Sequence, residues 1–182
     1  MAFQVLIIFA GLIIGWIKRG SVWNVEKFSL KLWWILPFAY LSQHISIAYL
    51  SGRAYEVMIV LSYILMIAFC SLNFKVSGMP WMLGGTLANV VALAANGLRM
   101  PAYVPAVRMM APKILGQLEA GTYGKSIAMT ASTHLNFLGD IFAFNVYPQS
   151  LLSVGDILFS IGLVVLIQNA MRAGSKGRAV DA

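Results

Sequence analysis

The sequence predicts an all-α fold: a polytopic transmembrane helix bundle of five to six spans, with room for one re-entrant or interfacial segment. Of its 182 residues, 60% are hydrophobic and only 10% are charged, whereas soluble domains carry roughly 25% charged residues. Apolar runs approaching the roughly 20 residues that a spanning helix needs recur along nearly the whole chain. Such spans use most of the chain, so we expect one integral membrane domain over residues 1–182 and no separate soluble catalytic domain.

Five apolar runs are the expected spans, and they cover residues 1–17, 32–50, 57–74, 79–98 and 151–171. The first run has no basic segment before it and is followed by Lys18 and Arg19, so we expect an uncleaved span with its N-terminus outside. Trp33 and Trp34 open the second run, where tryptophan anchors a helix at the membrane interface. The third run carries no charge, and its Cys70 is expected to be a small hydrophobe.

The fourth run carries a stripe of small residues on one helical face, which would let a neighbouring helix approach closely. The stripe consists of Gly84, Ala88, Ala92 and Ala95. Residues 99–125 then hold three prolines and four basic residues. Prolines at this density exclude a continuous helix, so we expect an interfacial loop. Within it, Ile114, Leu115 and Leu118 fit a short amphipathic helix.

Residues 126–146 are long enough to span a membrane, but they contain His134, Asn136, Asp140 and Asn145. This semi-polar segment either crosses the membrane or is re-entrant. The re-entrant alternative gives five full spans with eight Lys and Arg residues inside and five outside, and six spans that start inside give the same split. We favour five spans, because the basic loop nearest the N-terminus, residues 18–31, usually sets the orientation and would be cytoplasmic.

Polar side chains inside apolar segments are the default functional candidates in a membrane. On helical wheels, the fourth run and residues 126–146 each have one polar side, and we expect the two sides to face each other or a wet cavity. Asp140 either pairs with Arg99 or stays protonated through desolvation. Asp156 follows Ser153 by three residues, which is the spacing of a helix cap. The candidate ligand-binding residues are Asn89, Asn96, Arg99, His134, Asn136 and Asp140.

A set of short motifs carries a resemblance to a known family. These are Asn96-Gly97-x-x-Met100-Pro101, then His134, Leu138-Gly139-Asp140 and Ser153-x-Gly155-Asp156. In these motifs the chain resembles an uncharacterised family of small bacterial multi-pass membrane proteins, over roughly residues 89–158. The resemblance implies a bacterial inner-membrane setting and suggests that these polar residues act as a set, but it implies no chemistry.

Three functions compete at this stage. The first is binding or transport of a small solute or a lipid headgroup at the polar intramembrane site. The second is a non-catalytic structural subunit or assembly factor of a larger membrane complex. The third is an intramembrane enzyme with His134 and Asp140 as an acid–base pair, although their spacing points them apart on a helix.

The sequence contains no metal-binding or nucleophile motif, so we predict no catalytic or metal-ligating residues, and the cofactor stays unknown. The net charge of +7 fits basic loops facing anionic lipid rather than nucleic acid. The expected partners are the lipid bilayer and either a membrane protein partner or a second copy of the chain.

Overall fold

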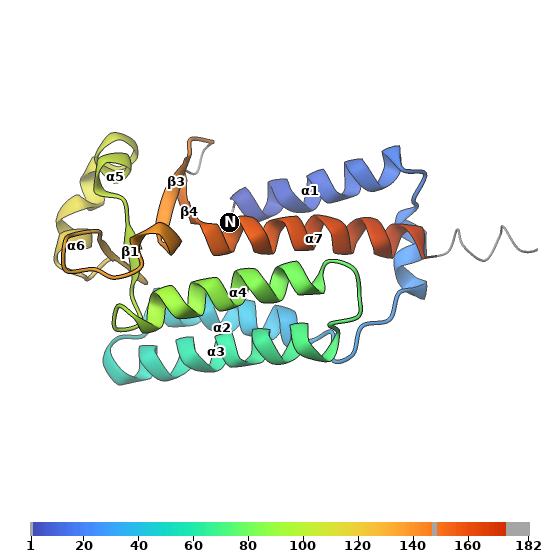
Figure 1. The fold of residues 1–182 in the computed structure, drawn as a ribbon, viewed down its shortest axis with the longest axis horizontal. Coiled ribbons are helices and arrows are strands. Elements are labelled where there is room, and N and C mark those ends of the chain that lie inside the picture. The colour runs from blue at the N-terminus through green and yellow to red at the C-terminus, as the bar shows by residue number, and fades with distance from the viewer. Residues whose placement is uncertain (1, 147–148, 174–182) are drawn as a thin grey trace, which may run out of the picture.

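A layer of lengthwise helices makes up most of the computed structural model, which describes residues 2–146 and 149–173, and a small sheet lies at one end of it (Figure 1). The sequence forms these helices where apolar residues continue for four or more turns without proline in the interior. Helix α7 packs between α1 and α4, α4 packs on α3, and α3 packs on α2. The long helices are α1 (Ala2–Ile17), α2 (Ile35–Tyr49), α3 (Gly52–Leu72), α4 (Met79–Ala94) and α7 (Val154–Arg172).

The sheet belongs to a cap built from the segment between α4 and α7. Its strands are β1 (Met100–Ala102), β2 (Ser126–Ala128), β3 (Asp140–Phe144) and β4 (Ser150–Ser153), in the order β2-β1-β3-β4. Strand β1 runs parallel to β2 and β3, and β3 runs antiparallel to β4. The other cap elements are α5 (Val104–Met110), η2 (Pro112–Ile114), α6 (Leu115–Glu119) and η3 (Asn136–Leu138), and η1 (Val22–Lys27) links α1 to α2.

The predicted all-α bundle of five to six spans is therefore wrong. Residues 126–146 form neither a spanning nor a re-entrant helix, because they hold β2, η3 and β3. Within the described residues, two helices are long and apolar enough to cross a membrane, Gly52–Leu72 and Val154–Arg172. The apolar helices Phe3–Ile17 and Met79–Ala94 are shorter. The expected amphipathic helix corresponds to η2 and α6, and its Leu118 is buried in the cap core with Ala102, Val107 and Ala128.

Pro101 lies in the middle of β1, an inner strand, where proline normally costs a ladder hydrogen bond. Here it costs none, because β1 pairs with β3 only from Ala102 onward, opposite Asp140. On its other side β1 is tied to the β2 segment by Met100 N–H to the Lys125 carbonyl (2.7 Å) and Met129 N–H to the Ala102 carbonyl (2.9 Å). The proline thus fixes the backbone angle φ without leaving a gap in the sheet.

Helices α4 and α7 are antiparallel and cross at two pairs of glycines. A Cβ added at Gly85 would collide with the Gly155 carbonyl oxygen, and one at Gly162 would lie 2.6 Å from the Gly78 carbonyl oxygen. The predicted packing role of Gly84 is wrong, since Gly84 is exposed and a Cβ there would meet nothing within 4 Å. The packing face is rotated by one residue and runs through Gly85, Asn89 and Ala92.

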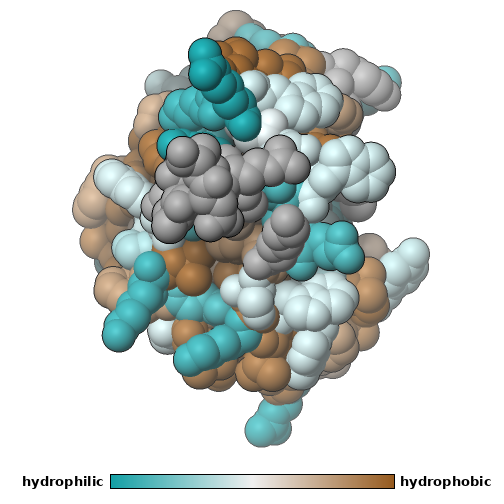
Figure 2. Space-filling model, turned by 90° about the vertical axis from the view of Figure 1, so that its right-hand side faces the viewer, coloured by the Kyte–Doolittle hydropathy of each residue, from teal (hydrophilic) through white to brown (hydrophobic). Residues whose placement is uncertain are grey.

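All five tryptophans lie at the end of the helical layer opposite the sheet. They are Trp16, Trp23, Trp33, Trp34 and Trp81, and each is more than half exposed. Basic residues occupy the same end, next to the ends of α1, α3 and α7 and before α2, and they include Lys18, Arg19, Lys31, Lys75 and Arg172. Figure 2 shows this face with separate hydrophilic side chains among hydrophobic and intermediate ones. The segments are tied together there by Ser21 N–H to the Met171 carbonyl (2.9 Å) and Lys31 N–H to Asn73 Oδ1 (2.8 Å). We call this the tryptophan end.

Candidate functional site

Polar side chains from six elements converge where the sheet meets the helices. We call this set the polar junction, and it consists of Tyr63, Asn89, Lys125, Ser126, Asp140, Ser153 and Asp156. Four of its residues are largely removed from water: Asn89, Asp140 and Tyr63 are less than a tenth exposed, and Ser153 is fully buried. Buried polar groups cost free energy unless they are paired, so the pairing pattern inside the junction decides what the site can do.

One half of the junction is a fully paired helix cap. The Ser153 hydroxyl accepts from the Asp156 N–H (2.9 Å), and Asp156 Oδ2 accepts from the Ser153 N–H (3.1 Å), so the predicted cap at the start of α7 is confirmed. Asn89 joins it from α4: its Nδ2 donates to Asp156 Oδ1 (2.9 Å) and its Oδ1 accepts from the Ser153 hydroxyl (2.7 Å). Gly155 permits this approach, because a Cβ there would collide with the Asn89 side chain.

The other half is incompletely paired. Asp140 opens β3 and is 6% exposed, and its backbone is held by β1 and β4, opposite Ala102 and Ser153. Ser126 is a hydrogen-bond partner of the Asp140 carboxyl. Oδ1 of that carboxyl is buried and has no hydrogen-bond partner among the described residues. An unpaired buried carboxylate oxygen is among the costliest groups in a folded protein.

Lys125 supplies the positive charge of the junction. It directly precedes β2, is partly buried, and is a hydrogen-bond partner of the Tyr63 hydroxyl on α3. The pKa of Lys125 is raised by Tyr63 first, and then by Asp156, Asp140 and Tyr55, against the effect of desolvation. Lys125 therefore stays protonated at neutral pH.

Burial dominates the titration of Asp140. Desolvation raises the pKa of the Asp140 carboxyl from 3.8 to about 7, and the negative charge of Asp156 acts in the same direction. Lys125 and the Ser126 hydrogen bond act against this increase. The direction follows from the geometry, because a nearly inaccessible carboxyl with one unpaired oxygen favours its neutral form. The described residues contain no group of three or more metal-ligating acidic, His or Cys side chains.

The remaining predicted site residues lie elsewhere in the cap. Asn96 holds the loop before η3: its Nδ2 donates to the His134 carbonyl and its Oδ1 accepts from the His134 N–H, both at 2.8 Å. The His134 residue itself is exposed. Asn136 closes the same loop, where its Oδ1 accepts from the Thr133 hydroxyl (2.7 Å). Of the six candidates, the structure thus brings Asn89 and Asp140 into the polar junction, and it joins Asn96, which follows α4, to the loop of His134 and Asn136.

Arg99 is separate from both groups and directly follows Leu98, which lines an apolar groove. Its guanidinium stacks over the Tyr55 ring at 4.7 Å and donates to the Gly124 carbonyl, so it is not paired with Asp140. The groove between α3 and α4 has a volume of about 250 Å³ and reaches Leu98, the residue before Arg99. Its other lining residues are Ile59, Val60, Tyr63, Ile64, Ile67, Val90, Leu93 and Ala94.

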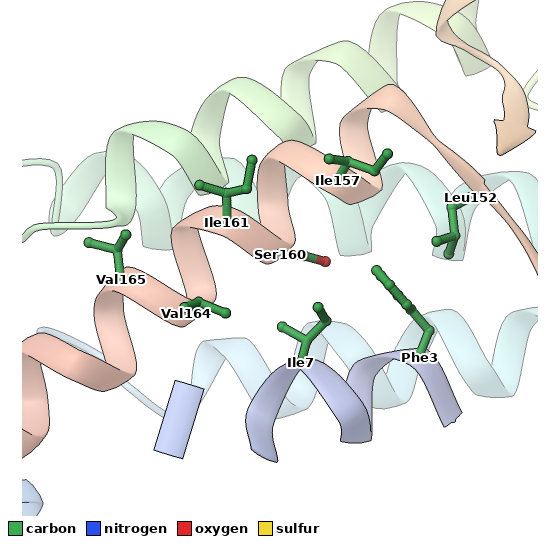
Figure 3. Close-up of a pocket in the computed structure, with 8 residues that line it drawn as sticks. All are labelled: Phe3, Ile7, Leu152, Ile157, Ser160, Ile161, Val164 and Val165. Atoms are coloured by element: carbon green, nitrogen blue, oxygen red, sulfur yellow. The ribbon is translucent and has the colours of Figure 1, made fainter. Parts of the chain in front are cut away.

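A second groove, of about 380 Å³, lies between α1 and α7 and is apolar throughout. Figure 3 shows Phe3 and Ile7 of α1 facing Ser160 and Val164 of α7 across it. The Ser160 hydroxyl donates to the Asp156 carbonyl (2.7 Å), which leaves this groove without a charged or unpaired polar group in its lining. The groove could therefore accommodate an apolar group, but its lining has no side chain that would recognise a polar or charged one.

Sequence reasoning missed the role of Lys125, Ser126 and Tyr63. Lys125 looks like an ordinary basic loop residue, and Tyr63 lies in an apolar run. Only the parallel pairing of β1 with β2 brings residue 125 next to the helices. No local pattern in the sequence signals that pairing, whereas the Ser153–Asp156 cap is visible as a spacing of three.

A comparison with protein families assigns the chain to one of them. Residues 27–168 match the family of unknown function DUF5317, and the chain belongs to this family. The match covers most of the chain and includes the polar junction, Arg99 and the α3–α4 groove. Neither the search of curated proteins nor the search of solved structures found a match.

Proposed function

We propose that this member of the DUF5317 family is an integral membrane protein that holds an anionic phospholipid in the groove between α3 and α4, with the headgroup at Arg99. The observation that carries this proposal is the apolar outer surface of the helices, which continues into a groove whose lining residue Leu98 directly precedes Arg99. The candidate membrane-crossing helices are α3 and α7, and the setting we propose is the bacterial inner membrane.

The outer face of α3 supports a lipid environment. Val57 is 58% exposed and Ile64 is 56% exposed, and they lie on a helix without charged residues from residue 57 to its end. Large apolar side chains are also exposed on α1, with Phe9 at 57% and Ile17 at 75%. An apolar surface that extends over several helices in this way marks an interaction site for lipid or protein. Contact with hydrocarbon chains removes the free-energy cost of exposing this surface to water.

The headgroup assignment rests on Arg99. A guanidinium has five N–H donors and binds phosphate in a bidentate manner, and the hydrogen bond that the structure gives Arg99 goes to the Gly124 carbonyl. Tyr55, on which Arg99 stacks, lies one turn before Ile59 of the groove. A phospholipid whose acyl chain lies in the groove would thus bring its phosphate to the partly buried guanidinium.

Lipid-dependent stabilisation tests this proposal. We expect an anionic phospholipid such as phosphatidylglycerol to raise the Tm of the detergent-solubilised protein more than phosphatidylcholine or inorganic phosphate does. Arg99→Gln should reduce that increase, measured against the lipid-free Tm of the same variant, and Ala94→Trp should reduce it by filling the groove. The matched control is Arg53→Gln, because Arg53 is exposed at the same end of α3 and outside the groove.

Three outcomes would overturn the lipid assignment. Equal stabilisation by both phospholipids would remove the role of the headgroup charge. An equal effect of inorganic phosphate would indicate a small-anion site, and an unchanged lipid response in Arg99→Gln would remove the guanidinium from the site.

The tryptophan end is expected to face the cytoplasm. Tryptophan concentrates at membrane interfaces, and Lys and Arg accumulate on the cytoplasmic side. In a chain whose Cys70 is replaced by alanine, a cysteine in place of exposed Ser29 at the tryptophan end should react with an impermeant maleimide only after cells are permeabilised. A cysteine in place of exposed Thr122 in the cap should react in intact cells. The opposite labelling pattern would reverse the orientation.

A role as a non-catalytic subunit is the second candidate, and the groove between α1 and α7 favours it. That groove is apolar and open along two helices, which suits a helix of a partner membrane protein. Purification of the protein in a mild detergent distinguishes the two functions. A stoichiometric protein partner that co-purifies with the wild type and is lost in Ile161→Gln would support the subunit role. Loss of lipid response in Arg99→Gln would support lipid binding.

A further inference from the structure

We propose that the polar junction is a proton-binding site, in which the Asp140 carboxyl takes up and releases one proton while Lys125 stays charged. This site is distinct from the lipid groove, and the inference does not rest on lipid binding. The reaction is the formation and cleavage of one O–H bond at the carboxyl, and water on the cap side supplies and accepts the proton.

The unpaired oxygen of the Asp140 carboxyl favours protonation. Asp140 is 6% exposed, and its Oδ1 has no hydrogen-bond partner among the described residues. An ionised carboxylate needs donors for both oxygens, and burial without them costs several kcal/mol. Protonation removes the charge, so the geometry favours the neutral acid over the carboxylate.

The other charges of the junction also favour a protonated Asp140. Lys125 contributes one positive charge and Asp156 one negative charge, so the site is neutral when Asp140 is protonated and carries a net negative charge when it is not. The Asp156 carboxyl is fully hydrogen-bonded, since Asn89 and the Ser153 N–H both donate to it. A metal cation fits less well than a proton, since the positive charge of Lys125 already acts on the same carboxyl.

Each element around Asp140 can be checked for competing groups. Helix α3 contributes the Tyr63 hydroxyl, and the β2 segment contributes Lys125 and Ser126. Helix α7 contributes Asp156, while α4 contributes the non-titrating Asn89. Neither strand that pairs with Asp140 brings a titratable side chain, since β1 consists of Met100, Pro101 and Ala102 and β4 of Ser150–Ser153. The carboxyl of Asp140 is therefore the group in the junction that changes charge near neutral pH.

Proton release would loosen the contact between sheet and helices. It leaves a net charge at a site where β3 is held by β1 and β4 and packs near α7. A buried net charge attracts water and weakens the surrounding packing. The protonated state thus keeps the cap docked on the helical layer, and the ionised state favours its opening.

Infrared spectroscopy of the full chain, labelled with ¹³C-aspartate, tests the proposal. The sequence has three aspartates, so the carbonyl band of a protonated, labelled carboxylic acid has few sources. We expect such a band in the wild type at about pH 5 and its loss by about pH 9. The same band should be missing in Asp140→Asn at both pH values.

Two further variants change the midpoint of this titration in opposite directions. Lys125→Met removes the positive charge and should raise the midpoint, whereas Asp156→Asn removes a negative charge and should lower it. If a variant does not fold, the titration of the labelled acid band in the wild type alone tests the proposal. Absence of a labelled acid band at pH 5 would overturn the proposal, as would its persistence in Asp140→Asn or equal midpoints in the two charge variants.

Discussion

Gly85→Ala is expected to destabilise the protein by about 1–3 kcal/mol, the usual range for overpacking a tight contact. The new Cβ would collide with the Gly155 carbonyl oxygen and lie 2.6 Å from the Phe159 backbone nitrogen. Backbone atoms of a packed helix cannot rotate away as a side chain can. Helices α4 and α7 would have to separate, and the Asn89 contacts with Ser153 and Asp156 would be lost with them.

Gly84→Ala is the matched control, one residue away in the same helix. A Cβ at Gly84 meets nothing within 4 Å, and alanine favours a helix over glycine by roughly 1 kcal/mol. Thermal unfolding in detergent should thus show a lower Tm for Gly85→Ala and an unchanged or higher Tm for Gly84→Ala. If both variants behaved alike, the rotation of the α4 packing face described above would be wrong.

The stability of the wild type is expected to fall as the pH rises from about 5 to about 8, by roughly 2 kcal/mol. Burial raises the pKa of Asp140 to about 7 in the folded protein, above its ordinary value of 3.8. The folded chain therefore binds this proton more tightly than the unfolded chain does. The resulting stabilisation is fully present below pH 3.8 and is lost as the pH rises through about 7.

Asp140→Asn isolates this contribution, because asparagine has the shape of the neutral acid and does not titrate. Denaturant unfolding at each pH should show a smaller pH dependence for Asp140→Asn than for the wild type. Asp156→Asn should instead lose stability at every pH, since it disrupts the helix cap. Equal pH dependence in Asp140→Asn and the wild type would exclude Asp140 as its source.

The helices could be read from the sequence because their signal is local. An apolar run of 16–21 residues without an interior proline has few alternatives to a helix, and α1, α3, α4 and α7 lie within or close to the runs recognised above. The cap at α7 was equally local, since Ser153 and Asp156 are three residues apart. The ends of the helices were harder to predict than their centres. The expected run continued to residue 98, whereas α4 ends at Ala94, before Gly97 and Leu98, which both have positive φ.

The sheet could not be read from the sequence because its signal is not local. Its strands have three to five residues, too few for an alternating pattern to stand out. Pro101 argues against an inner strand unless the register with β3 is known. For the same reason, the sequence suggested Arg99 as a charged partner of Asp140. In the fold, the positive charge of Lys125 acts on Asp140, and Arg99 stacks on Tyr55.

In the membrane setting proposed above, the exposed apolar side chains of the long helices contact lipid. Spin labels at Ile64 of α3, Ile161 of α7 and Thr122 of the cap, all exposed, test this contact most directly in vesicles with Cys70 replaced by alanine. We predict that the two helix labels are accessible to oxygen and protected from a water-soluble nickel complex, and that the cap label shows the reverse. Helix labels as accessible to the nickel complex as the cap label would contradict the membrane assignment.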